Sequence, residues 1–190
     1  MDGLKDNVRM AAESLAETEK QRDLALAESR KIIRLSKNVI HAIHVGSDPS
    51  GPKAEMEDRM KELISGLSES MLLSGPAADA MMEFAEAELL SDVIGRTPIR
   101  SYSDLGITPQ AWLMGMADTV GEIRRVIVGL LMDGDYARAK ALFAAMEEMA
   151  EELLMLDIPD AVVPLRRKQD VARGIVEKTR SDMLNASLRV

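Results

Sequence analysis

Apolar residues recur at helical spacing along most of the chain, and short stretches rich in Gly, Pro, Ser and Asp interrupt them. The pattern predicts helices over residues 4–45, 53–73, 77–94, 109–132, 135–156 and 163–186. No strand-like alternation and no internal repeat is visible. We therefore expect an all-α, single-domain helical bundle of six to seven helices that spans residues 1–190.

The interruptions contain residues typical of helix boundaries. "GSDPSGP" at 46–52 is predicted to be a loop, and Pro76 is well placed in the first turn of the third helix. Thr108 followed by Pro109 predicts an N-cap and the first helical residue. Gly134 predicts a tight turn between two helices. Residues 95–110 form a longer irregular connection.

The first predicted helix is long for a chain of 190 residues. At 1.5 Å per residue it would extend for about 60 Å, and it needs partners along its whole length to cover its apolar positions. One small domain cannot easily provide them. We therefore expect the protein to form oligomers.

Composition agrees with a helical, globular protein. Hydrophobic residues make up 46% and charged residues 29% of the chain, and aromatics only 3%. The 14 Met residues are best explained as core filler between helices, and a Met-lined ligand groove is the less common alternative. The absence of cysteine excludes disulfides and thiolate metal sites.

Charge and hydropathy exclude other classes of protein. The net charge of −8 argues against a broadly basic surface that binds nucleic acid by charge alone. No secretory signal pattern opens the chain, and no apolar stretch approaches the roughly 20 residues that span a bilayer. We expect a cytoplasmic protein that does not enter a membrane.

Two predicted helices each place two carboxylates on one side. Glu83 and Glu86 are three residues apart in "AMMEFAEAELL", and Asp118 and Glu122 are four apart in the next long helix. Gly115, Gly121 and Gly129 lie on the same side of that helix, although a glycine inside a helix destabilises it. They suggest a face that another backbone or a ligand approaches closely.

Four carboxylates that converge on one point would repel one another, and a divalent cation would relieve the repulsion. Mg²⁺ prefers oxygen ligands and keeps waters that can serve chemistry on a phosphate. The alternative is that both pairs simply face water, as acidic pairs on helices often do. A di-iron bundle needs two Glu-x-x-His motifs, which are absent. His41 and His44 are better explained by packing or hydrogen bonding.

Other catalytic motifs are missing. The chain has no phosphate-binding P-loop, no G-x-S-x-G and no convincing Ser-His-Asp set. The basic residues Arg166, Arg167 and Lys168 could contact phosphate, but a solvated patch is the simpler interpretation. Arg125 lies one turn after Glu122 and could contact phosphate or form an ion pair with Glu122.

Several segments resemble one known family. "WLMGMADTVGEIRRVIVGLLMDGDYARA" resembles the C-terminal half of translin and translin-associated factor X, and "MEFAEAELL" is similar to an E-Y-V-E-A segment of the latter. "LAESRKIIRLSKNVIHAIH" matches the start of the family more weakly. "VVPLRRKQDVARGIVEKTRSDM" is similar to its last helix. The resemblance covers nearly the whole chain.

The resemblance implies a catalytic subunit like translin-associated factor X. In that branch the acids bind Mg²⁺, for which Mn²⁺ can substitute, and cleave single-stranded RNA. Carried over residue by residue, Glu83, Glu86, Asp118 and Glu122 fall on the catalytic and metal-binding acids, and Arg125 falls on a shared arginine that could bind nucleic acid. The family forms closed shells, so a homo-oligomeric shell is expected here.

The chain also departs from the family. "SGPAADAMM" has none of the basic residues that translin carries before its third helix, which puts translin-style RNA binding there in doubt. The connection over residues 95–110 is shorter than in translin-associated factor X, which favours a minimal version that assembles with itself. Two functions remain open: a Mg²⁺-dependent endoribonuclease, or a non-catalytic oligomer that binds single-stranded nucleic acid, RNA or DNA.

Overall fold

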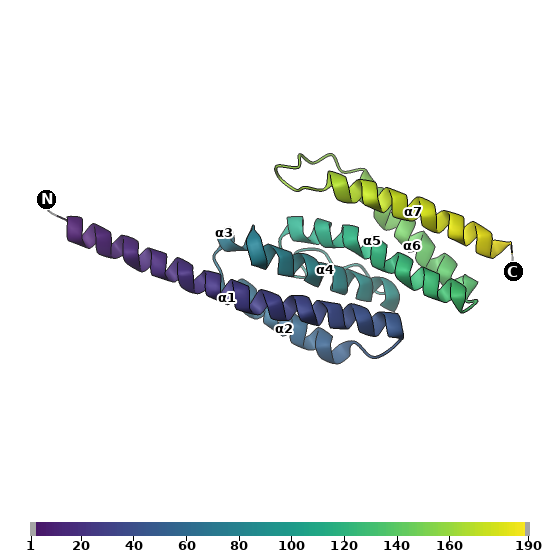
Figure 1. Cartoon of the computed structure of the whole chain (residues 1–190), viewed down its shortest axis with the longest axis horizontal. Helices are drawn as coiled ribbons and strands as arrows, with labels where there is room; N and C mark the ends of the chain where they lie inside the picture. The colour runs from purple at the N-terminus through teal and green to yellow at the C-terminus, as the bar shows by residue number, and fades with distance from the viewer. Residues whose placement is uncertain (1–2, 189–190) are drawn as a thin grey trace.

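The computed structural model describes residues 3–188, which fold into seven helices and contain no strand in this range (Figure 1). The all-α prediction is therefore confirmed. The helices are α1 (Leu4–Val45), α2 (Ser50–Gly66), α3 (Glu69–Leu72), α4 (Gly75–Gly95), α5 (Pro109–Met132), α6 (Tyr136–Leu154) and α7 (Arg166–Ser187).

One predicted helix is divided and one predicted loop is shorter than expected. The prediction of a single helix over 53–73 is wrong, because α2 ends at Gly66 and Leu67 is extended before the single turn of α3. At Gly66 a Cβ would lie 2.4 Å from the end of the Leu24 side chain of α1, so that side chain would have to shift to admit a larger residue. The predicted loop over 46–52 ends early, since α2 already begins at Ser50.

The predicted helix boundaries that depend on local chemistry are confirmed. The Thr108 hydroxyl accepts a hydrogen bond from the Ala111 amide at 3.3 Å, and Pro109 opens α5. Pro76 lies in the first turn of α4. Gly134 turns the chain between α5 and α6 with a φ of 78°, a conformation that glycine adopts without a steric penalty.

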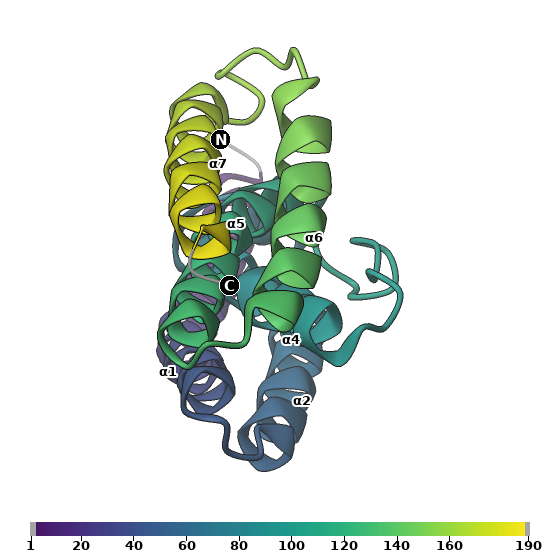
Figure 2. The same ribbon diagram turned by 90° about the vertical axis from the view of Figure 1, so that its right-hand side faces the viewer.

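Helix α4 lies in the middle of the bundle. It packs against α1 on one side and α5 on the other, while α6 and α7 cover α5 and pack against each other (Figures 1 and 2). Residues on nearly every side of α4 are buried as a result. Methionines fill much of this core, as predicted; the buried ones are Met56, Met60, Met81, Met116, Met146, Met149 and Met183.

The N-terminal half of α1 extends beyond the bundle (Figure 1). Residues 3–20 are exposed throughout, and Leu4, Val8 and Leu15 lie close together around the helix with more than half of their surface open to solvent. This segment has no partner within residues 3–188 of its own chain. Oligomerisation stays a prediction. The exposed apolar stripe formed by Leu4, Val8 and Leu15 is consistent with it. None of the described helices is long and apolar enough to cross a membrane.

Candidate functional site

Three acids lie near enough to Glu86 of α4 for their charges to act on it: Glu83 of the same helix, and Asp118 and Glu122 of α5, which packs against α4. Glu83 and Glu86 of α4 and Asp118 and Glu122 of α5 are all half-buried. Burial raises the pKa of Glu86, and the negative charges of Asp118, Glu83 and Glu122 raise it further, to about 8. The structure thus brings together the acids that the sequence predicted on separate helices.

Gly115 allows the two helices to approach each other beside these acids. A Cβ at this position would lie 2.6 Å from the Met82 carbonyl oxygen and 2.9 Å from the Glu86 nitrogen. The next turn continues the contact, because the Thr119 hydroxyl donates to the Gly115 carbonyl at 2.9 Å and lies 3.4 Å from the Glu86 carbonyl. The predicted close approach at a glycine is confirmed here.

The other two glycines of this face behave differently. A Cβ added at Gly121 would lie 3.7 Å from the Ile175 side chain of α7, an ordinary packing distance. A Cβ added at Gly129 would meet no atom within 4 Å. No backbone within residues 3–188 approaches Gly129, which is exposed near the end of α5, so that part of the prediction is wrong at this position. Approach of a ligand to this face stays a prediction.

Two basic side chains from other helices complete the site. Lys168 of α7 forms an ion pair between its Nζ and the Asp118 Oδ2, and His44 of α1 forms a short contact between its Nε2 and the Glu122 Oε2. The interpretation of Lys168 as part of a solvated patch is wrong, since this side chain is only 22% exposed. The prediction that His44 forms a hydrogen bond is confirmed, whereas His41 is exposed.

Sequence reasoning missed the membership of both residues in the site. Lys168 lies 50 positions from Asp118 along the chain, and His44 lies 78 positions from Glu122. Neither residue is part of a motif that predicts such a pairing. Only the packing of α7 and α1 around α5 brings them to the acids.

The fit of this site to a divalent cation can be tested on its donors. Four neighbouring carboxylates supply the oxygen ligands that Mg²⁺ prefers, and burial together with the three acidic neighbours raises the pKa of Glu86. The side chains do not stand in ligand geometry, however: within residues 3–188, no three acids or histidines are arranged to hold a metal ion. Asp118 and Glu122 are instead engaged by Lys168 and His44.

Arg125 lies at the edge of the site. Its guanidinium is 3.8 Å from the Glu122 carboxylate, so the ion pair considered for these two residues is present. The Arg125 side chain is still 64% exposed, which leaves its N–H groups free to face solvent or a ligand. Contact between Arg125 and nucleic acid stays a prediction.

A second charged cluster lies on the opposite side of α4, because residues 86 and 88 are about 200° apart around a helix. The Glu88 side chain is fully buried, Lys53 of α2 contacts it at 2.7 Å, and Arg100 pairs with it directly. Burial raises the pKa of Glu88, and the two cations oppose that effect. Sequence reasoning overlooked Glu88, although it stands in the same stretch as Glu83 and Glu86.

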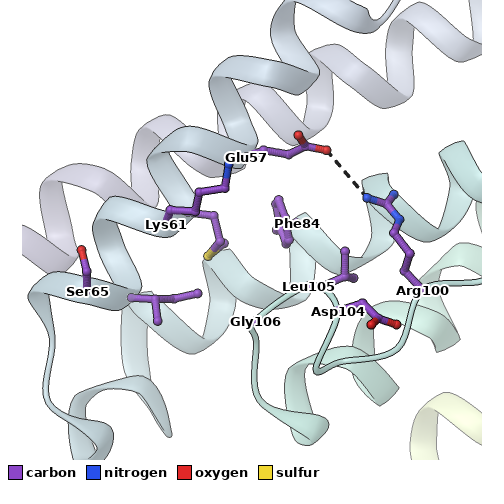
Figure 3. A pocket seen from close by; sticks show the side chains of 10 residues that line it. Glu57, Lys61, Ser65, Phe84, Arg100, Asp104, Leu105 and Gly106 are labelled. Carbon is purple, nitrogen blue, oxygen red and sulfur yellow. Dashed lines mark ion pairs between the residues drawn. The ribbon is translucent and has the colours of Figure 1, made fainter.

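Arg100 connects this cluster to Asp92 and to Glu57. It contacts Asp92 at 2.8 Å, and its guanidinium is 3.7 Å from the Glu57 carboxylate. Figure 3 shows this last pair beside Phe84, at a cavity of about 410 Å³ between α2 and the loop that follows α4. The interlocked charges join α2, α4 and the loop, so the cluster serves to hold these segments together.

Comparisons with known proteins agree with this architecture. A model of the translin family matches residues 67–190. An uncharacterized protein of Methanocaldococcus jannaschii is 30% identical over 186 residues, which cover 94% of this chain and 82% of that protein.

Solved structures resemble the whole chain. The crystal structure of AfC3PO is 30% identical with a TM-score of 0.87, and the match covers 96% of this chain and 98% of that one. A structure of AfC3PO in complex with duplex RNA has a TM-score of 0.77 at 30% identity, with 96% and 97% covered. Apo-NeC3PO is 25% identical with a TM-score of 0.81, and 98% of each chain is covered. The chain belongs to the translin family.

Proposed function

We propose that this chain is a divalent-cation-dependent endoribonuclease of the branch that resembles translin-associated factor X. The observation that carries the proposal is the gathering of three other carboxylates near Glu86, whose pKa is raised to about 8 by burial and by these acidic neighbours. Such mutual repulsion is unfavourable in a site that serves only stability. It is expected where a cation binds during function.

Glu83, Glu86, Asp118 and Glu122 would hold the ion, with Mg²⁺ as the proposed cofactor and Mn²⁺ as a substitute. When bound, such an ion lowers the pKa of a water and stabilises negative charge on phosphate oxygens. The neighbouring residues have distinct roles. Arg125, exposed beside Glu122, can donate hydrogen bonds to a phosphate oxygen of the substrate. Gly115 allows α4 and α5 to pack closely beside these acids.

RNA is the substrate class that the comparisons favour. AfC3PO, which resembles this chain over nearly its whole length, has been seen in complex with duplex RNA. The resemblance to translin-associated factor X points instead to single-stranded RNA as the strand that is cut. We propose single-stranded RNA as the substrate, bound within a homo-oligomeric shell, and both forms of RNA belong in the test.

The net charge of −8 bears on how RNA would bind. An acidic protein gains little from general attraction to phosphate, so contacts must be local or made through a cation. Sequence preference is expected to be slight, because nothing at the site resembles a platform for stacking or reading bases.

The proposal can be tested with end-labelled RNA, single-stranded and duplex, incubated with the protein in Mg²⁺ or in EDTA. Cleavage of the single strand in Mg²⁺ alone is expected. Glu86→Ala and Asp118→Ala should each reduce the rate by at least about a hundredfold, the usual scale for removal of one group that stabilises developing charge. Asp58→Ala is the matched control, since Asp58 is an exposed acid on α2.

The outcomes separate the candidate functions. RNA binding without cleavage in Mg²⁺, unchanged by Glu86→Ala, would support a non-catalytic oligomer that binds nucleic acid. That alternative has one observation in its favour: Asp118 is already paired with Lys168, and Glu122 is already in contact with His44. Absence of both binding and cleavage would contradict both functions.

A further inference from the structure

Lys168 occupies the acid cluster as a cation supplied by the protein itself. Its ammonium reaches Asp118 from α7, across the interface with α5, and the two side chains are 22% and 35% exposed. The neighbouring basic residues of α7 differ from it, because Arg166 and Arg167 are exposed. One cation of this run is therefore placed in the site while the others face solvent.

This placement matters because the cluster holds an excess of negative charge. Burial and then three acids raise the pKa of Glu86, and Lys168 is the neighbour that opposes them by lowering it. A positive charge in contact with a carboxylate attracts it more strongly at a partly buried site than in bulk water. The ammonium thus relieves part of the repulsion that a divalent cation would relieve more fully.

The ammonium and a metal ion cannot use the same Asp118 oxygen. A lysine ammonium has three N–H donors and no acceptor, so it cannot act as a ligand, and its positive charge repels a nearby divalent cation. The contact between Nζ and Oδ2 also helps to explain why the acids are not in ligand geometry among the described residues.

We propose that Lys168 is a built-in counter-ion of the acid cluster, which competes with a divalent cation for Asp118 and so sets the cation concentration at which the site fills. The inference rests on the proposed function, since it concerns the same four acids. Lys168 is a positioning residue in this scheme: it keeps Asp118 compensated until the ion arrives, and its side chain then moves away.

The test is a calorimetric titration of the whole, metal-free protein with Mn²⁺ in the absence of RNA. Lys168→Met keeps most of the side-chain length and removes the charge. It should bind Mn²⁺ at least about tenfold more tightly than the original protein, a conservative figure for removing a charge at contact distance. Lys168→Arg keeps the charge and should leave the affinity within about threefold.

Arg167→Met is the matched control, because it removes the same charge from the adjacent, exposed position of α7. Screening by solvent and salt should keep its effect small. Thermal unfolding gives a second readout: Lys168→Met should unfold at a lower temperature in EDTA and gain more from Mn²⁺ than the original protein does. If Lys168→Met does not fold, Lys168→Gln is the second neutral variant and should show the same gain in affinity.

The outcomes for the two proposals differ. If the original protein and the neutral variant bind Mn²⁺ equally well, or the neutral variant binds less well, the counter-ion inference is overturned while the metal site stands. If only the neutral variant binds Mn²⁺, the inference is supported. If neither binds Mn²⁺, both the inference and the proposed metal-dependent function are overturned.

Discussion

The backbone of Gly115 in α5 lies directly against the backbone of Glu86 in α4, so that a Cβ on Gly115 would approach the Glu86 nitrogen to 2.9 Å. A methyl group here must push the helices apart. Gly115→Ala should lower the free energy of unfolding by about 1–3 kcal/mol, the usual cost of overpacking a core. The substitution should also separate the acids and so reduce the affinity for Mn²⁺. Denaturant unfolding measures the loss of stability, and calorimetry measures the affinity for Mn²⁺.

Gly129→Ala is the control for this variant. Gly129 lies in the same helix, and a Cβ there would meet no neighbour within 4 Å. Alanine should therefore stabilise the protein by about 0.5–1 kcal/mol through its better helix propensity. If Gly115→Ala instead raised the free energy of unfolding as much as Gly129→Ala does, α4 and α5 would not meet at Gly115.

Glu86 should make the metal-free protein less stable as the pH rises. The folded protein holds the Glu86 proton up to about pH 8, whereas the unfolded chain loses it near the ordinary value of 4.5. Between those values the folded state binds more protons, so the free energy of unfolding should fall by at most about 1.4 kcal/mol per pH unit. Below and above this window Glu86 adds no slope. Urea unfolding in EDTA at several pH values measures this change of the free energy of unfolding with pH.

Glu86→Gln should remove this slope, because glutamine resembles the protonated acid and does not ionise. Near pH 8 the variant should be more stable than the original protein in EDTA. Glu148→Gln, at an exposed position of α6, should leave the slope in place. If the pH dependence of stability persists in Glu86→Gln, it arises from another titrating group.

Arg100 should matter for stability and not for metal binding. Arg100→Met leaves the buried carboxylates Glu88 and Asp92 with too little positive charge. Breaking a buried ion pair in this way should cost about 3–5 kcal/mol. Lys61→Met is the control, since Lys61 forms an exposed pair with Asp58 and should cost less than about 1 kcal/mol. Similar losses for the two variants in urea unfolding would contradict the structure of the cluster.

The exposed apolar stripe of α1, formed by Leu4, Val8 and Leu15, should be a contact between subunits. Val8→Glu combined with Leu15→Glu places charges on this stripe and should reduce the oligomer mass measured by light scattering. The helix content should change little, because both residues are exposed in the single chain. Ala16→Glu, about 100° away around the helix from Leu15, is the control. An unchanged mass in the double variant would exclude this stripe from the assembly.

Much of the fold could be predicted because helix boundaries depend on local chemistry. Thr108 caps α5 and Gly134 turns the chain into α6, each through atoms within a few positions of it. The break after Gly66 could not be predicted in this way. Leu67 is extended there, and the Ser68 amide that follows donates to the Gln21 side chain of α1 at 3.1 Å, a contact between residues 47 positions apart.

The same division applies to the candidate site. Helical spacing alone determined that Glu83 and Glu86 share one face of α4 and that Asp118 and Glu122 share one face of α5. Only the tertiary structure decided that these faces meet, that Lys168 pairs with Asp118 and that His44 contacts Glu122. The physical reason is range: backbone periodicity acts over a turn or two, whereas charges 50 or 78 positions apart meet only when packing brings their helices together.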